Sequence, residues 1–88
     1  MDLMLAKSKA GHDIKKVYVV VREEDEYLYL ANGTTKLLSN PKKKKKIHLQ
    51  LIKKIPSEVL DEIKDVSALD DVKIKRILKS YNRRNEDV

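Results

Sequence analysis

Residues 17–31 of the chain, VYVVVREEDEYLYLA, decide its fold class. The first six are mostly β-branched or aromatic, a composition that favours a strand. In the last five, tyrosines alternate with aliphatic residues, which is the period of a second strand with two different faces. The four acidic residues between them, 23–26, predict a solvated turn. The stretch therefore predicts two antiparallel strands joined by a turn.

Further short strands are predicted on both sides of this stretch. The dipeptide Asn32-Gly33 can supply the positive φ angles of a tight hairpin before another strand over residues 34–38. In residues 47–51 apolar and polar side chains alternate, and a weaker strand is predicted over residues 3–8. We expect about five short antiparallel strands, which close most simply as a small β-barrel because closure removes exposed sheet edges.

The hydrophobic period changes to that of a helix at Pro56-Ser57. Behind the Ser57 cap, apolar residues recur at helical spacing: Val59, Leu60, Ile63 and Val66. A second helix is predicted behind Asp70, with an apolar stripe formed by Ile74, Ile77, Leu78 and Tyr81. The predicted class is mainly β with C-terminal helices: a barrel over residues 1–55, a two-helix extension packed on the barrel over 56–84, and a frayed tail over 85–88.

Length and composition limit the classes of protein to consider. A chain of 88 residues without Phe or Trp forms one small domain with a modest, aliphatic core, which suits binding better than a deep pocket. The absence of Cys excludes disulfides, thiolate zinc sites and cysteine nucleophiles, and it suits a reducing cytoplasm. Because the first residues lack signal-peptide features and no apolar stretch approaches ~20 residues, we expect a soluble, cytoplasmic protein.

Positive charge is concentrated in the first two thirds of the chain. Residues 1–56 hold thirteen Lys and Arg against six Asp and Glu, whereas residues 57–88 hold seven against eight. Five consecutive lysines, Lys42, Lys43, Lys44, Lys45 and Lys46, repel one another and predict an anionic partner. A nucleic-acid backbone is favoured over a solvated loop or a membrane surface, since no lipidation site or basic amphipathic helix accompanies the run. If all five lysines contact phosphates, replacing them with Ala lowers the salt dependence of RNA binding by roughly 3 in log–log slope.

The segment from Lys9 to Val21, KAGHDIKKVYVVV, resembles a KOW motif. In that family a basic loop with a glycine at its turn leads into a β-branched strand. With Asn32-Gly33, the lysine run, the segment after it and the closing helices, nearly the whole chain is similar to short bacterial KOW proteins related to large-subunit ribosomal proteins of the fourteen-e type. The resemblance implies an SH3-like barrel that binds RNA, ribosomal RNA above all, with ribosomal proteins as further possible partners. Where the usual motif has a second glycine, this chain has Ile14-Lys15-Lys16.

The predicted RNA contacts come from the Gly11 loop, the lysine run and one histidine. Gly11 allows a positive φ or a close approach of the backbone to RNA, although an ordinary hairpin glycine is an equal alternative. The basic residues around it can donate to phosphates, and His12 can also stack on a base. His48 is predicted on a polar strand face, as an RNA contact or simply exposed. The full predicted set is Lys9, Gly11, His12, Lys15, Lys16, Lys42, Lys43, Lys44, Lys45, Lys46 and His48.

Other functions find less support in the sequence. The two histidines match no metal-ligand pattern, and the acidic cluster lacks a nucleophile or a phosphate loop, so we expect no enzyme activity, metal or cofactor. Tyr27 and Tyr29 share one strand face and form a base-stacking platform if that face is outward, a point that the sequence leaves open. We expect a monomer. A protein-interaction module of SH3-like fold and a nonspecific DNA or polyanion binder remain alternatives.

Overall fold

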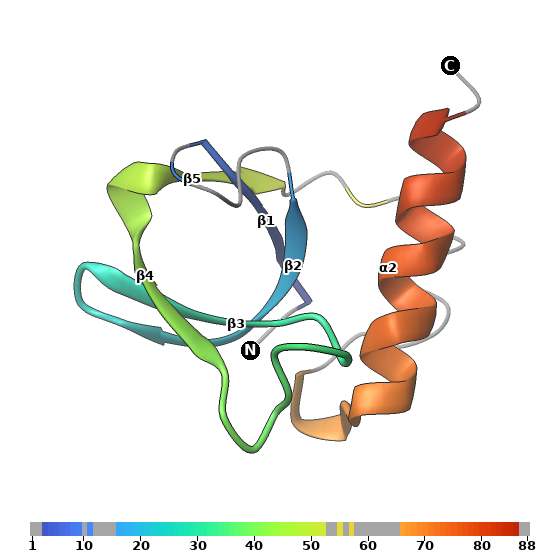
Figure 1. Cartoon of the computed structure of the whole chain (residues 1–88), viewed down its shortest axis with the longest axis horizontal. Helices are drawn as coiled ribbons and strands as arrows, with labels where there is room; N and C mark the ends of the chain where they lie inside the picture. Colours follow the sequence, from blue (N-terminus) through green and yellow to red (C-terminus); the bar gives the residue numbers. More distant parts are fainter. Residues whose placement is uncertain are drawn as a thin grey trace.

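The computed structural model describes residues 3–9, 11, 16–52, 55, 57 and 66–86. Over these residues, five strands form one antiparallel sheet in the order β4-β3-β2-β1-β5, and one α-helix follows it (Figure 1). The strands are β1 (Leu5–Ser8), β2 (Val17–Glu24), β3 (Tyr27–Ala31), β4 (Lys42–Lys45) and β5 (Leu49–Ile52). The helical elements are the 3-10 turns η1 (Lys46–His48) and η2 (Val66–Ala68) and the helix α2 (Asp71–Glu86).

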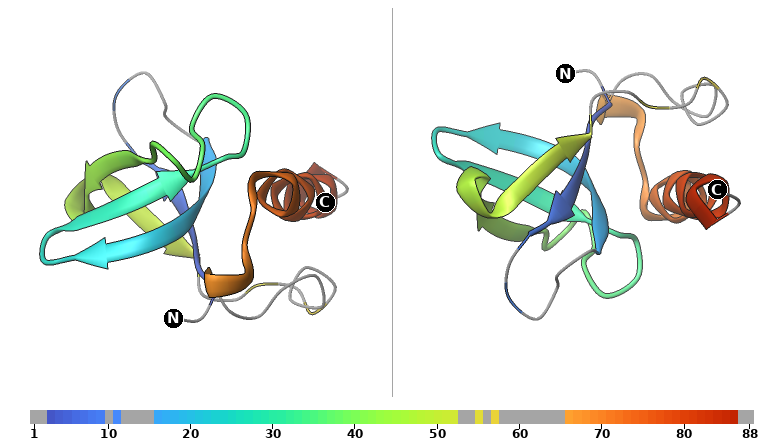
Figure 2. Two further views of the ribbon diagram at one scale, coloured as in Figure 1. Left: turned by 90° about the horizontal axis from the view of Figure 1, so that it is seen from below. Right: turned by 90° about the horizontal axis from the view of Figure 1, so that it is seen from above.

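The sheet curls into a barrel-like shape but its hydrogen-bonded order stays open. Strands β4 and β5 are its two edges, and the turn η1 connects them (Figures 1 and 2). The expectation of about five antiparallel strands is confirmed, whereas complete closure of the barrel is not observed among the described strands. The β2–β3 pair matches the predicted strands of residues 17–31, with Asp25 at a φ of 49° in the acidic turn.

The predicted hairpin at Asn32-Gly33 and the predicted strand after it are wrong. The Asn32 side-chain carbonyl accepts hydrogen bonds from the backbone N–H groups of Thr34 and Lys36, both at 2.9 Å. These side-chain bonds hold residues 32–36 in bends, because they offer the backbone an alternative to the sheet ladder. The fourth strand is instead the lysine run itself, which pairs with β3.

The alternation predicted for residues 47–51 holds only in part. Leu49 is buried at 5 % exposure, but Ile47 lies in η1 and is 73 % exposed. The polypeptide turns tightly there to cross from one edge of the sheet to the other, so the strand begins only at Leu49. The expected common apolar face of Ile47 and Leu49 is therefore absent.

Two hydrophobic clusters stabilise the described part of the fold, one on each face of the sheet. The inner cluster fills the curl and contains Ala6, Tyr18, Val20, Leu28, Leu30 and Leu49. The outer cluster lies between the sheet and α2 and contains Leu3, Leu5, Val19, Ala31, Ile74, Ile77 and Leu78 (Figure 2). Burying each of the two helix isoleucines, which have no exposed surface, contributes roughly 1.5–3 kcal/mol.

Helix α2 was predicted at its start but is longer than expected. Asp70 is the N-cap, since its Oδ1 accepts a hydrogen bond from the backbone N–H of Lys73 at 2.7 Å. The predicted stripe faces the sheet, with Ile74 and Ile77 fully buried and Tyr81 partly buried against the same cluster. The helix continues to Glu86, so the predicted frayed tail is wrong at residues 85 and 86.

The other predicted helix, from Ser57 to Val66, falls almost entirely outside the described residues. Its last predicted apolar residue, Val66, belongs to the 3-10 turn η2. The part of the chain that is described thus contains one α-helix rather than the two predicted. No helix within that part is long and apolar enough to cross a membrane.

Candidate nucleic-acid interface

Strand β4 divides its lysines between the two faces of the sheet. Lys42 lies opposite Leu30 and Lys44 opposite Leu28, and because directly opposed side chains share a face, both lysines are on the inner side. Lys44 is half-buried, and its Nζ donates a hydrogen bond to the Oγ of the buried Ser8. This contact joins the edge strand β4 to β1 across the interior of the curl.

Burial changes the charge balance of the two inner lysines. It lowers the pKa of Lys42 below its usual range, and the positive charge of Lys44 acts in the same direction. The two ammonium groups therefore carry a cost of desolvation and mutual repulsion within the curl. Their placement suits a structural role more than contact with an external phosphate chain.

The outward-facing lysines lie beside two tyrosine rings. Lys43 is paired with Tyr29, and Lys45 with Tyr27, on the outer face. The Nζ of Lys43 lies 4.4 Å from the ring centroid of Tyr27 and 5.9 Å from that of Tyr29. The guanidinium carbon of Arg22 lies 5.0 Å from the Tyr29 centroid. This surface, formed by Arg22, Tyr27, Tyr29, Lys43 and Lys45, is called the tyrosine platform below.

The platform settles which face of β3 is exposed. Tyr27 and Tyr29 are half-buried, whereas Leu28 and Leu30 between and beyond them have no exposed surface. Cation–π contacts of this kind contribute about 0.5–1 kcal/mol each at exposed sites, and they hold positive charge against the ring faces. Bases stack on similar aromatic surfaces in proteins that bind single-stranded nucleic acids.

Two acidic side chains lower the positive charge at the edge of this surface. Glu24 forms an ion pair with Arg22 at 2.6 Å, and both side chains are largely exposed. Glu23 forms another with Lys46, also at 2.6 Å, so the last lysine of the run is bound to the β2–β3 hairpin. Exposed pairs of this type contribute little to stability, and a phosphate can compete for their cations.

The other predicted contacts lie on the segments that follow β1 and β4. The backbone N–H of Lys9 donates to the carbonyl of His48 at 2.9 Å, which places these two exposed residues side by side. Gly11 has a φ of +83°, as expected, and a side chain there would meet no atom within 4 Å. His12 and Lys15 lie outside the described residues.

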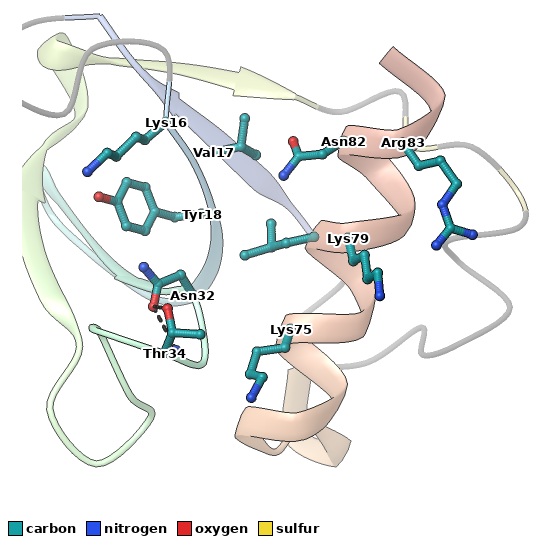
Figure 3. Close-up of a pocket in the computed structure, with 10 residues that line it drawn as sticks. Lys16, Val17, Tyr18, Asn32, Thr34, Lys75, Lys79, Asn82 and Arg83 are labelled. Atoms are coloured by element: carbon teal, nitrogen blue, oxygen red, sulfur yellow. Dashed lines mark hydrogen bonds between the residues drawn. The ribbon is translucent and has the colours of Figure 1, made fainter. Parts of the chain in front are cut away.

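A groove of about 740 Å³, which the sequence reasoning missed, lies between the start of β2 and helix α2 (Figure 3). Its described lining residues include four cations and no acid; they are Lys16, Val17, Tyr18, Asn32, Thr34, Lys75, Leu78, Lys79, Asn82 and Arg83. Of the predicted contacts, it contains Lys16 only. The sequence signal was the recurrence of Lys75, Lys79 and Arg83 every four residues, but the opposite wall is set by tertiary packing.

The groove differs from the platform in having no accessible aromatic ring. Tyr18 contributes to the lining but is only 3 % exposed, and burial raises the pKa of its hydroxyl above the usual value of 10.0. The described residues contain no group of three or more His, Cys, Asp or Glu side chains that could hold a metal ion. The site chemistry is therefore that of cations, amides and hydroxyls.

Comparison of the chain with protein-family models gave no match, and neither did a comparison with curated proteins. The case for a function consequently depends on the motif resemblance and on the two basic surfaces described above.

Proposed function

We propose that the protein binds RNA, with the tyrosine platform stacking unpaired bases and the surrounding cations contacting the phosphates. The observation that carries this proposal is the outward orientation of Tyr27 and Tyr29 together with the cations against their rings. An aromatic surface ringed by Lys and Arg matches the two chemical parts of a single-stranded segment, a flat apolar base and an anionic backbone.

The mechanism separates affinity from base contact. Lys43 and Lys45 project from an edge strand, so a nucleic-acid strand can approach them without displacing a neighbouring β-strand. When a base stacks on Tyr29, the planar guanidinium of Arg22 can stack in turn or move to the adjacent phosphate. Phosphate contacts of this kind position the RNA, and the rings select unpaired over paired bases.

The favoured target is structured RNA, and ribosomal RNA in particular, because the KOW resemblance implies it. Loops and bulges of a folded RNA supply the unpaired bases that the platform requires. We further propose a cytoplasmic, ribosome-associated role with a monomeric protein. The Gly11 loop, the other half of the site implied by the resemblance, would contact the same RNA.

A comparison of RNA with heparin tests the base-stacking proposal. Heparin is a polyanion without bases, so replacing both tyrosines (Y27L/Y29L) should weaken RNA binding while leaving heparin binding nearly unchanged. Loss of stacking costs about 1–3 kcal/mol per base, or roughly 5- to 150-fold in affinity for each ring that holds a base. The measurement is fluorescence anisotropy with a labelled 12-nucleotide single-stranded RNA.

The matched control is Tyr81→Leu, which alters a half-buried tyrosine on α2 away from the platform. Thermal unfolding checks that each variant is folded. Equal weakening of RNA and heparin binding by Y27L/Y29L would mean that only charge is recognised and would contradict the proposal. RNA affinity that is insensitive to salt would instead favour a protein-interaction module.

A further inference from the structure

The groove between β2 and α2 presents a regular row of cations on its helical wall. Lys75, Lys79 and Arg83 are spaced four residues apart, so neighbouring side chains are about 6 Å apart along one face of the helix. This separation is comparable to that of successive phosphates along one nucleic-acid strand. Lys16 adds a cation from the opposite wall, at the start of β2 (Figure 3).

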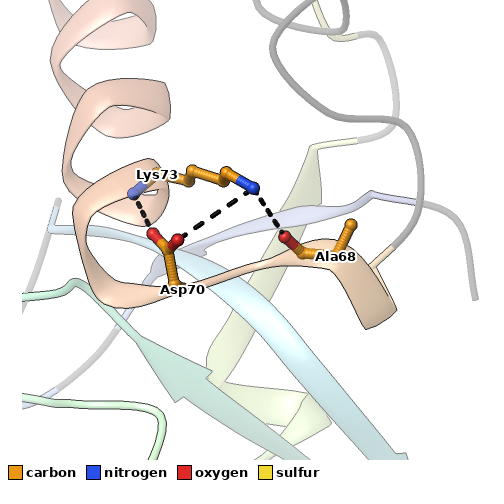
Figure 4. A network of polar contacts seen from close by, with 3 residues as sticks. All are labelled: Ala68, Asp70 and Lys73. Carbon is orange, nitrogen blue, oxygen red and sulfur yellow. Dashed lines mark hydrogen bonds and ion pairs between the residues drawn. The ribbon is translucent and has the colours of Figure 1, made fainter.

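The helix that carries this row is held firmly against the sheet. Its N-terminus is capped by Asp70, and the Nζ of Lys73 also donates to the carbonyl of Ala68 at 3.2 Å (Figure 4). The Asp71 carboxylate accepts a hydrogen bond from the backbone N–H of Leu38 at 2.9 Å, which ties the helix to the segment after β3. The groove therefore exists before any ligand binds.

Gly33 makes this close packing possible. Its φ is +78°, and a Cβ at this position would lie 2.4 Å from the carbonyl oxygen of Asp71 and 2.7 Å from Cγ of Lys75. Only a residue without a side chain allows the loop to approach the first turn of the helix so closely. The loop also brings Asn32 and Thr34 to the groove.

The lining matches a sugar–phosphate backbone better than it matches bases. The cations and the exposed amide of Asn82 can donate to phosphate oxygens, while Val17 and Leu78 provide an apolar floor. Since the ring of Tyr18 is buried, the groove offers no exposed aromatic surface on which a base could stack. An elongated row of like charges without an acidic residue among the described lining also concentrates the field on an extended anion.

We propose that this groove is a second RNA site, which holds the sugar–phosphate backbone of a strand whose bases are not read there. The inference rests on the proposed RNA-binding function. Both sites lie along β2, with Val17 in the groove and Arg22 on the platform, so they are separated by roughly 17 Å at ~3.4 Å per strand residue. A single RNA strand of several nucleotides can reach both.

Matched charge removal on the two flanks of α2 tests the site. In K75Q/K79Q the groove loses two exposed cations, whereas K73Q/R76Q removes the same charge from exposed or half-exposed positions of the same helix that do not line the groove. Two lost phosphate contacts should lower the log–log salt slope by about 1.4 and weaken binding about 25-fold at 0.1 M salt. The control pair should leave the slope nearly unchanged.

Crosslinking gives a readout that does not depend on affinity. The chain has no Cys, so Asn82→Cys labelled with a benzophenone maleimide places a single photoreactive group in the groove. It should crosslink to a single-stranded 12-nucleotide RNA, and the same label at Lys73→Cys should crosslink much less. Crosslinking is done with the full chain at low salt.

The outcomes separate this inference from the proposed function. If Y27L/Y29L weakens RNA binding but K75Q/K79Q behaves like K73Q/R76Q and the Asn82→Cys label gives no preferential crosslink, the groove is not an RNA site and the platform still is. If wild-type protein binds no RNA, both proposals are wrong. Preferential crosslinking together with the slope change supports the groove.

Discussion

The alternation of the lysine run makes a quantitative prediction about salt dependence. If only the outward side chains contact RNA, replacing Lys43 and Lys45 with Gln removes two phosphate contacts, whereas replacing Lys42 and Lys44 removes none. At about 0.7 per contact on single strands, K43Q/K45Q should reduce the log–log slope by about 1.4. This corresponds to about 25-fold weaker binding at 0.1 M salt.

The inner pair should instead affect stability. Lys44 donates to the buried Ser8 hydroxyl, and a hydrogen bond to a charged group contributes about 1.5–3 kcal/mol. We therefore expect K42Q/K44Q to lower the free energy of unfolding, measured by urea titration, by an amount near the lower end of that range. Relief of the repulsion between Lys42 and Lys44 offsets part of the loss.

The two variants carry the same change in net charge, so each is the control for the other. Binding is measured by anisotropy with one RNA at four or more salt concentrations between 50 and 300 mM. Equal slope changes in the two pairs would refute the reasoning from strand alternation. A slope unchanged in K43Q/K45Q would remove the run from the interface altogether. The total effect of the run is expected to be well below the value of roughly 3 that five equivalent contacts would give.

Three further predictions follow from single side chains. Glu24→Gln frees Arg22 from its 2.6 Å ion pair and should strengthen RNA binding several-fold at low salt, an effect that disappears at high salt in the same anisotropy assay. Gly33→Ala places a Cβ 2.4 Å from a backbone oxygen at a positive φ and should lower the free energy of unfolding by roughly 1–3 kcal/mol, whereas Gly11→Ala, with open space around it, should cost less. Because burial raises the pKa of Tyr18, the unfolded state ionises first, so stability should fall as the pH rises above about 10; Tyr18→Phe should show a smaller decline in thermal melts between pH 9 and 11.

The elements predicted correctly are those whose signal is local. The β-branched run at residues 17–22 and the alternation at residues 27–31 each carry their own strand period, and both strands form as expected. Asp70 likewise caps α2 because capping involves only the next three residues. Such patterns hold whatever the rest of the chain does.

The errors arise where a side chain or a partner strand decides the outcome. Asn32 has a turn-forming sequence context, but its side chain bonds to Thr34 and Lys36 and produces bends in place of a hairpin. The lysine run has low strand propensity, yet it pairs with β3, whose inner leucines and outer tyrosines accept the aliphatic stems of its side chains. The groove could not be predicted because one wall comes from β2 and the other from α2.

The position of charge in the fold therefore matters more than its density in the sequence. Five adjacent lysines repel one another most strongly on one surface, and a strand relieves this repulsion because successive side chains point to opposite faces. Two then enter the curl, two extend outward beside Tyr27 and Tyr29, and Lys46 pairs with Glu23. At the same time, the C-terminal third, which has a net negative charge in the sequence, contributes the cationic wall of the groove, because its basic residues lie on one side of α2. An RNA strand that follows the cations would thus contact both parts of the chain, and the salt slopes of the platform and groove variants should add, since the two sites are roughly 17 Å apart.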